Sequence, residues 1–172
     1  MSARRASPSA GAARSPTCAD SVPRLPSPTV FNPAKDDVRR FFCEAWAKHR
    51  QSLPLTPLES IALDWILEHP EYHDDLADLE RALVADYPPE GGRTNPFLHL
   101  SMHLAVSEQV SIDQPPGIRD AYARLASRTG SLHEAAHGII ECLGEVVWAA
   151  QRDRTLPDSA RYIDCVLRRA GR

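Results

Sequence analysis

The chain has 172 residues, a formal net charge of −3 and 42% hydrophobic residues, values that fit a globular protein and exclude a strongly basic nucleic-acid binder. No apolar run approaches the roughly 20 residues that a membrane-crossing helix needs. The N-terminus carries arginines but lacks the apolar segment of a secretory signal. We therefore expect a cytoplasmic protein with no nucleic-acid partner and no membrane partner.

Residues 1–30 differ in composition from the rest of the chain. They are rich in Ser, Ala, Pro and Arg, and Asp20 is their only acidic residue. Their prolines recur at positions that prevent a long helix, and the segment has too little apolar surface to offset the entropy lost on ordering. We expect residues 1–30 to form a disordered tail and residues 31–172 to form a single helical domain.

From residue 31 onward, apolar residues recur at the spacing of amphipathic helices, separated by short loops that contain proline and glycine. The pattern predicts helices over 33–51, 58–69, 73–85, 95–112, 118–128, 131–154 and from 158 onward. Two helix starts have the form of a capping box, Thr56 with Glu59 and Ser131 with Glu134. Helices joined by short connections predict an all-α fold, a bundle of about six or seven helices.

The segment 95–112 also fits a strand, because apolar residues occupy alternate positions from 98 to 104. However, Asn95 followed by Pro96 is a typical helix start. The segment is also long and has few β-branched residues in its first half. We therefore favour a helix over 95–112.

The four cysteines form no C-x-x-C pair and no closely spaced framework of the kind found in disulfide-rich or zinc-binding domains. They are Cys18, Cys43, Cys142 and Cys165. Three of them fall in helical patterns, where a buried unpaired thiol behaves as a small hydrophobic residue. We therefore expect reduced thiols in a reducing compartment rather than disulfides.

The histidines are distributed far from randomly. Six of the seven fall into three H-x-x-x-H pairs, namely His69 with His73, His99 with His103, and His133 with His137. Residues four apart lie on one face of a helix. Two imidazoles in this arrangement can bind one metal ion, or face a second helix that completes the shell.

The pairs on segments 95–112 and 131–154 both lie on the apolar face of their predicted helix, so the two helices turn four histidines towards one interior. Glu141 lies one turn beyond the second pair, at the edge of the same face. The predicted metal ligands are His99, His103, His133, His137, Glu141 and His73. We expect His69, which precedes a proline, to cap the next helix, and His49 to be solvated.

A buried hydrogen-bond network is the alternative to a metal site. A single inward-facing histidine is most often a core residue, and each buried imidazole has a donor and an acceptor that need partners. Four such residues on two helices favour a metal ion, because neutral imidazole is a common ligand. Zinc, iron and manganese all accept imidazole together with carboxylate, so the sequence predicts a divalent metal ion without identifying it.

Residues 133–137 read His-Glu-Ala-Ala-His, the H-E-x-x-H pattern in which the glutamate of zinc peptidases acts as general base. Glu134 also lies three residues after Ser131, where a capping box places a glutamate. We favour the capping role, because no strand-rich cleft of a peptidase is predicted. The general base is the alternative.

Several stretches share the motifs of one bacterial family. Residues 95–105 read NPFLHLSMHLA and residues 108–118 read EQVSIDQPPGI. Further stretches are FNP at 31–33, VRRFF at 38–42, HPEYH at 69–73 and ECLGE at 141–145. Together they resemble a family catalogued as domain of unknown function 1841, over about residues 31–155. The resemblance implies no activity, and because it starts near Phe31 we expect the tail to be an upstream extension or to precede the true start.

Two functions fit these features. The first is a metal-binding helical-bundle protein, which could be a metal-dependent enzyme if the ion keeps an open coordination position. The second is a non-enzymatic interaction module with a structural metal site or a buried histidine network. An open position beside a cavity favours the enzyme, whereas a closed four-ligand shell without a cavity favours the module.

Overall fold

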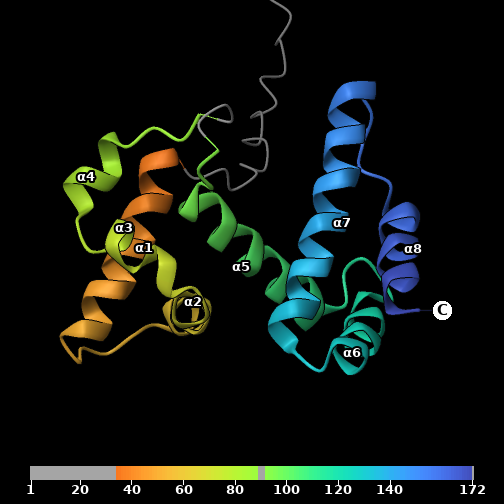
Figure 1. The fold of residues 1–172 in the computed structure, drawn as a ribbon, viewed down its shortest axis with the longest axis horizontal. Helices are drawn as coiled ribbons and strands as arrows, with labels where there is room; N and C mark the ends of the chain where they lie inside the picture. The colour runs from red at the N-terminus through yellow and green to blue at the C-terminus, as the bar shows by residue number, and fades with distance from the viewer. Residues whose placement is uncertain (1–33, 89–91, 172) are drawn as a thin grey trace, which may run out of the picture. The chain divides into compact units, whose positions relative to one another are not determined.

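The computed structural model describes residues 34–88 and 92–171, and this part of the chain consists of helices without a β-strand (Figure 1). The helices are α1 (Lys35–Arg50), α2 (Pro57–Glu68), the 3-10 helix η1 (Pro70–Tyr72), α3 (His73–Leu76), α4 (Leu79–Val84), α5 (Pro96–Ile112), α6 (Ile118–Thr129), α7 (Leu132–Asp153) and α8 (Ser159–Ala170). The predicted all-α class is confirmed. The predicted tail and Cys18 lie outside the described residues.

The predicted helix over 73–85 consists of two short helices, α3 and α4, in the structure. Asp78 causes the break, because its side chain accepts a hydrogen bond from the backbone N–H of Arg81 at 3.0 Å. This bond is an N-cap, and it starts a new helix at Leu79. The extra helix start explains why the structure has more helices than the sequence predicts.

Helices α2, α5, α7 and α8 begin where their sequences predict. Thr56 and Glu59 form the complete capping box of α2, with both reciprocal bonds present. Asn95 caps α5, because its side-chain oxygen accepts from the backbone N–H groups of Phe97 and Leu98. The strand alternative for this segment is therefore wrong.

Helix α5 runs between two groups of helices (Figure 1). Each group has its own hydrophobic core, and α5 contributes to both. Phe97 and Leu100, near its start, belong to a core shared with α1, α2, α3 and α4. Val106, further along, belongs to a second core shared with α6, α7 and α8. The middle of α5, which carries His99 and His103, therefore lies where the two cores meet.

Arg39 is a buried charged residue in the first core. Its guanidinium donates to the backbone carbonyls of Ala82, Leu83 and Ala85 at 2.7–2.9 Å. These carbonyls lie at the C-terminal end of α4, which lacks intrahelical partners for them and carries partial negative charge. Arg39 thus fastens the short helix α4 to α1.

Cys142 of α7 and Cys165 of α8 form a disulfide, so the prediction of reduced thiols is wrong for this pair. Both residues are buried in the second core, where their helices pack together. Cys43 is a buried free thiol, as predicted. Cys142 and Cys165 are 23 positions apart in the sequence, and this spacing matches no motif from which the pairing could be predicted. Disulfides are uncommon in reducing compartments, so this pair does not support the predicted cytoplasmic location, which stays a prediction.

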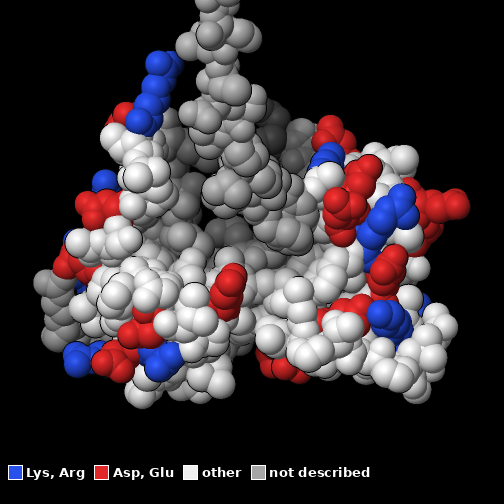
Figure 2. Space-filling model, turned by 180° about the vertical axis from the view of Figure 1, so that it is seen from behind, with Lys and Arg blue, Asp and Glu red and all other residues white. Residues whose placement is uncertain are grey.

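Acidic and basic side chains are interspersed over the described part of the face drawn in Figure 2. No helix among the described residues is both long and apolar enough to span a membrane. The expected absence of a nucleic-acid partner stays a prediction.

Candidate metal centre

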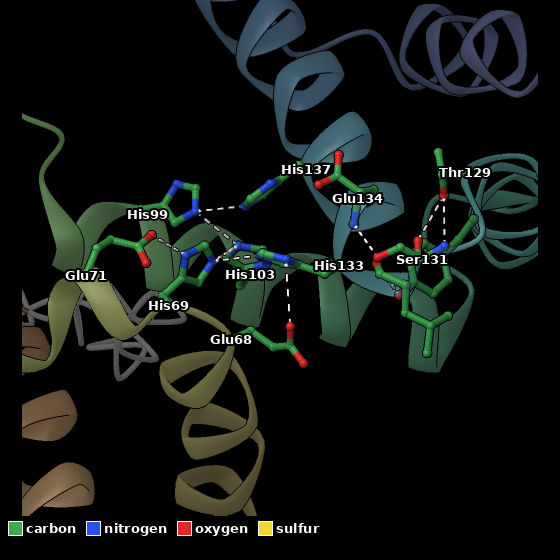
Figure 3. A network of polar contacts seen from close by, with 12 residues as sticks. Glu68, His69, Glu71, His99, His103, Thr129, Ser131, His133, Glu134 and His137 are labelled. Atoms are coloured by element: carbon green, nitrogen blue, oxygen red, sulfur yellow. Dashed lines mark hydrogen bonds and ion pairs between the residues drawn. The ribbon is translucent and has the colours of Figure 1, made fainter.

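Five histidine side chains converge at the middle of α5 (Figure 3). The Nε2 atom of His69 lies 2.9 Å from that of His103 and 3.2 Å from that of His133. The Nε2 atom of His99 lies 3.1 Å from that of His103 and 3.1 Å from that of His137. One nitrogen of each of the residues His69, His99, His103 and His137 lies within 4.8 Å of the other three. The structure thus brings together four predicted ligands and adds His69.

Three separate elements supply these histidines. His99 and His103 lie one turn apart on α5, and His133 and His137 lie one turn apart on α7. His69 is the C-cap of α2, where the backbone leaves the helix with φ −124° and ψ 65°. Pro70 forces this change, because a proline disfavours helical conformation in the residue before it. The break turns His69 towards α5.

The aromatic ring of Trp65 covers one side of the cluster. It stacks on His103 with ring centroids 4.2 Å apart. Its indole N–H donates to the hydroxyl of Ser107 at 2.8 Å, and that hydroxyl donates to the backbone carbonyl of His103. His103 is fully buried, and its Nδ1 atom has no hydrogen-bond partner among the described residues. The ring of His103 is therefore held by stacking, with Nε2 directed at the other histidines.

Burial, followed by the charges of neighbouring imidazoles, lowers the pKa of three cluster histidines. The pKa of His99 falls to about 4 and that of His103 to about 2. The pKa of His137 is also lowered. These three residues are consequently neutral at pH 7, and neutral imidazole is the form that binds metal ions.

Two carboxylates contact the outer nitrogens of the cluster (Figure 3). The Nδ1 atom of His69 lies 2.8 Å from Oε1 of Glu71, and Nδ1 of His133 lies 3.7 Å from Oε2 of Glu68. Burial acts to raise the pKa of Glu71, but its hydrogen bond with His69 and other polar contacts outweigh that effect, so the pKa is lowered. Glu71 is therefore ionised at neutral pH.

A groove of about 670 Å³ opens beside His137, between α6, α7 and α8. Charged residues of both signs line it: Glu134, Glu141, Glu145, Arg128, Arg168 and Arg169. His137 is the one cluster histidine among the residues that line this groove, so the groove adjoins the candidate metal centre at His137.

Glu134 forms half of its predicted capping box. Its backbone N–H donates to the hydroxyl of Ser131 at 3.2 Å. The N–H of Ser131 donates instead to the hydroxyl of Thr129 at 3.4 Å, so the reciprocal bond to the Glu134 carboxylate is not part of the described capping contacts. The exposed side chain of Glu134 lines the groove together with His137. Its carboxylate is therefore available for a role other than capping.

Two predicted ligands lie outside the cluster. His73 donates from Nε2 to the backbone carbonyl of Ile66 at 2.9 Å and stacks on Trp46 with ring centroids 4.2 Å apart. Glu141 is exposed and forms an ion pair with Arg169. These partners hold both side chains away from the five converging Nε2 atoms. His49 is exposed, as expected.

His69 is the member of the cluster that the sequence does not predict. It is buried, with 2% of its surface exposed, and it contacts histidines of both α5 and α7. The available signal was its position directly before Pro70. That position ends α2, and the end of a helix can direct a side chain that helical periodicity cannot place.

Among the comparisons with known proteins, a protein-family model matches the part of the chain that carries the five histidines. No curated protein and no solved structure matches the chain. One family model spans residues 34–168 and so includes α2, α5 and α7. This is the family that the sequence motifs resemble, and by this match the chain belongs to the family described as Domain of unknown function (DUF1841).

Proposed function

We propose that this protein binds one divalent transition-metal ion in the histidine cluster and uses it in a metal-dependent reaction. The proposed ligands are His69, His99, His103 and His137, with His133 beside His69 as the candidate for a fifth. The observation that carries the proposal is the convergence of five Nε2 atoms from three elements, with neighbouring atoms 2.9–3.2 Å apart.

A hydrogen-bond network alone cannot account for all the close contacts between these nitrogens. A neutral imidazole has one N–H group and one lone pair, so each Nε2 atom can make one good hydrogen bond, as donor or as acceptor. The Nε2 atom of His69 contacts those of both His103 and His133. The Nε2 atom of His99 likewise contacts two neighbours. A cation among them would satisfy every lone pair at once, which supports a metal site over a network.

The spacing of the nitrogens also bears on the coordination geometry. Imidazole nitrogens bound at about 2.1 Å from one ion and about 90° apart lie about 3 Å from each other, compared with about 3.4 Å in a tetrahedral shell. The separations of 2.9–3.2 Å fit the first arrangement better. The nitrogens of His69, His99, His103 and His137 lie within 4.8 Å of one another, as ligands of one ion must, whereas in the described part of the chain Nε2 of His133 contacts only that of His69.

The chemistry of the ligands restricts the metal. Imidazole nitrogen suits zinc, iron, copper and nickel, whereas calcium and magnesium prefer oxygen ligands. A bound divalent ion with an open position supplies Lewis-acid chemistry to a substrate. Manganese prefers sites with carboxylate ligands. Glu141, the only carboxylate among the predicted ligands, lies outside the cluster, so the cluster suits manganese less well.

The groove beside His137 favours an enzyme over an interaction module. Its volume of about 670 Å³ is large enough for a small substrate. A purely structural metal site is typically closed by four protein ligands and has no adjoining cavity. The carboxylate of Glu134, which lines the same groove, is the candidate general base for such a reaction.

Metal analysis of tag-free protein tests the proposal, since an affinity tag of histidines would itself bind metal. We expect one divalent ion per chain after titration of the metal-free protein with zinc. His103→Ala and His137→Ala should each weaken zinc binding, although they lie on different helices. His49→Ala is the control and should bind zinc like the wild type, because His49 is exposed and outside the cluster.

Two results would exclude the shared site. The first is wild-type zinc affinity in correctly folded His103→Ala and His137→Ala variants. The second is a wild-type protein that binds no divalent ion from zinc, iron, manganese, nickel or copper. Either result would favour the buried histidine network and the non-enzymatic interaction module.

A further inference from the structure

We propose that Glu71 is a positioning residue of the metal site, which fixes the orientation and tautomer of His69, and that Glu71 and Glu68 together bring negative charge to the site. The proposal rests on the metal site proposed above and extends it beyond the ligands. Metal-binding histidines commonly donate their second ring N–H to a carboxylate, which makes the ligating nitrogen more basic.

The contact between Glu71 and His69 determines where the imidazole proton lies. Oε1 of Glu71 is 2.8 Å from Nδ1 of His69, and a carboxylate can only accept, so Nδ1 carries the proton. A neutral imidazole has one proton, and Nε2 of His69 is therefore left with a free lone pair. That lone pair is directed at the cluster, 2.9 Å from Nε2 of His103.

Glu68 lies near the corresponding nitrogen of His133 but makes no hydrogen bond with it. Its Oε2 atom lies 3.7 Å from Nδ1 of His133, which is an ion-pair distance rather than a hydrogen-bond distance. Glu68 therefore contributes less to orientation than Glu71. The dashed contacts in Figure 3 show both carboxylates on the outer side of their histidines, away from the converging nitrogens.

One short stretch of sequence supplies all of these groups. Glu68 is the last residue of α2, His69 is its C-cap, and Glu71 lies in η1 directly after Pro70. The helix end therefore delivers one ligand, a carboxylate for that ligand and a carboxylate for a ligand on α7. This arrangement depends on the chain leaving the helix at His69.

The charge of the site supports the same roles. Imidazole ligands carry no charge and leave the two positive charges of a divalent ion uncompensated, and an uncompensated charge is costly away from water. Glu68 and Glu71 bring two negative charges to the outer side of the cluster. On the groove side, Glu141 is paired with Arg169 and offers less compensation.

Zinc affinity of metal-free, tag-free variants tests the inference, measured by competition with a chromogenic chelator. Glu71→Gln keeps an acceptor oxygen but loses the charge, and we expect zinc binding to weaken about 10–100-fold. Glu71→Ala should weaken it further, and Glu68→Gln should have a smaller effect than Glu71→Gln. The matched control is Glu108→Gln, which removes one exposed charge from α5 without touching the cluster.

Cobalt(II) provides a second readout that a merely structural role would not change. Its visible absorption reports the geometry of the bound nitrogens, so Glu71→Gln should alter the spectrum while circular dichroism stays unchanged. The side chain of Glu71 is 57% exposed, and its replacement is not expected to unfold the protein. If the wild type binds zinc and both Glu71 variants match its affinity and its cobalt spectrum, the inference is overturned and the metal site stands. If the wild type binds neither ion, both are overturned.

Discussion

The Nε2 atoms of His69 and His103 lie 2.9 Å apart, although 34 positions separate the residues in the sequence. This contact joins the end of α2 to the middle of α5, and the contact of His69 with His133 extends it to α7. The histidine cluster therefore depends on the tertiary fold and not on any single H-x-x-x-H pair. Its properties should respond to mutations on all three elements.

The stability of the metal-free protein should fall as the pH decreases from about 6.5 towards 4. The unfolded chain protonates its histidines near pH 6.5, whereas folded His99 does so only at about 4. Between these values the unfolded state binds more protons, so acid favours unfolding. His103, with a folded pKa of about 2, acts in the same direction.

Urea titrations at pH 7.0 and 5.0 would measure this effect, in a range where most carboxylates remain ionised. His99→Asn should reduce the difference between the two midpoints. His49→Ala should leave it unchanged, because His49 is exposed. Equal midpoints for the wild type at both pH values would show that burial of the histidines does not oppose their protonation.

Replacement of Glu134 should affect stability little. Its carboxylate is outside the described capping contacts of α7, so Glu134→Gln and Glu134→Ala should each change the free energy of unfolding by less than about 0.5 kcal/mol. Ser131→Ala is the comparison, since it removes the observed cap and should cost about 1 kcal/mol. Thermal and urea unfolding would measure both. A loss of about 1 kcal/mol or more in Glu134→Ala would restore the capping role.

Arg39 should be important for stability. Arg39→Met keeps much of the apolar side chain but leaves the carbonyls of Ala82, Leu83 and Ala85 without their partner. We expect a loss of about 2–4 kcal/mol in the free energy of unfolding. Arg40→Met is the matched control, because the neighbouring Arg40 is exposed. Similar stabilities of the two variants would contradict the role assigned to Arg39.

The disulfide between Cys142 and Cys165 should stabilise the fold by about 2–4 kcal/mol. Peptide mapping under non-reducing conditions should recover the two cysteines in one linked fragment. The Cys142→Ser and Cys165→Ser double variant should unfold at a lower urea concentration than the wild type. Recovery of both thiols in free form from protein kept away from reductant would contradict the pairing.

The sequence predicts the helices well because their caps and apolar periodicity act over a few residues. Thr56, Asn95 and Asp158 start helices where local hydrogen bonding predicts them. Periodicity also identifies the inward faces that carry His99 and His103. Periodicity does not predict where His69 points, because the direction of the chain at the helix end before Pro70 depends on tertiary packing.

Three features of the structure therefore could not be predicted from local pattern. His69 joins the cluster through a helix end, and His73 is held away by its stacking on Trp46. The buried Arg39 finds its partners more than 40 positions away in the sequence. Each feature is a long-range contact, and a single sequence shows no periodic signal for such contacts.

A comparison of His69→Ala with His73→Ala tests the account most directly. The two residues form one H-x-x-x-H pair in the sequence, but only His69 contributes to the five converging Nε2 atoms. Zinc affinity would be measured by chelator competition on both variants and the wild type, with circular dichroism as the check of folding. We predict that His69→Ala weakens zinc binding at least about 10-fold, because it removes one of the ligands and breaks the contact between α2 and α5. His73→Ala should retain wild-type affinity. Equal affinities in the wild type and His69→Ala, or a loss confined to His73→Ala, would contradict the proposed centre.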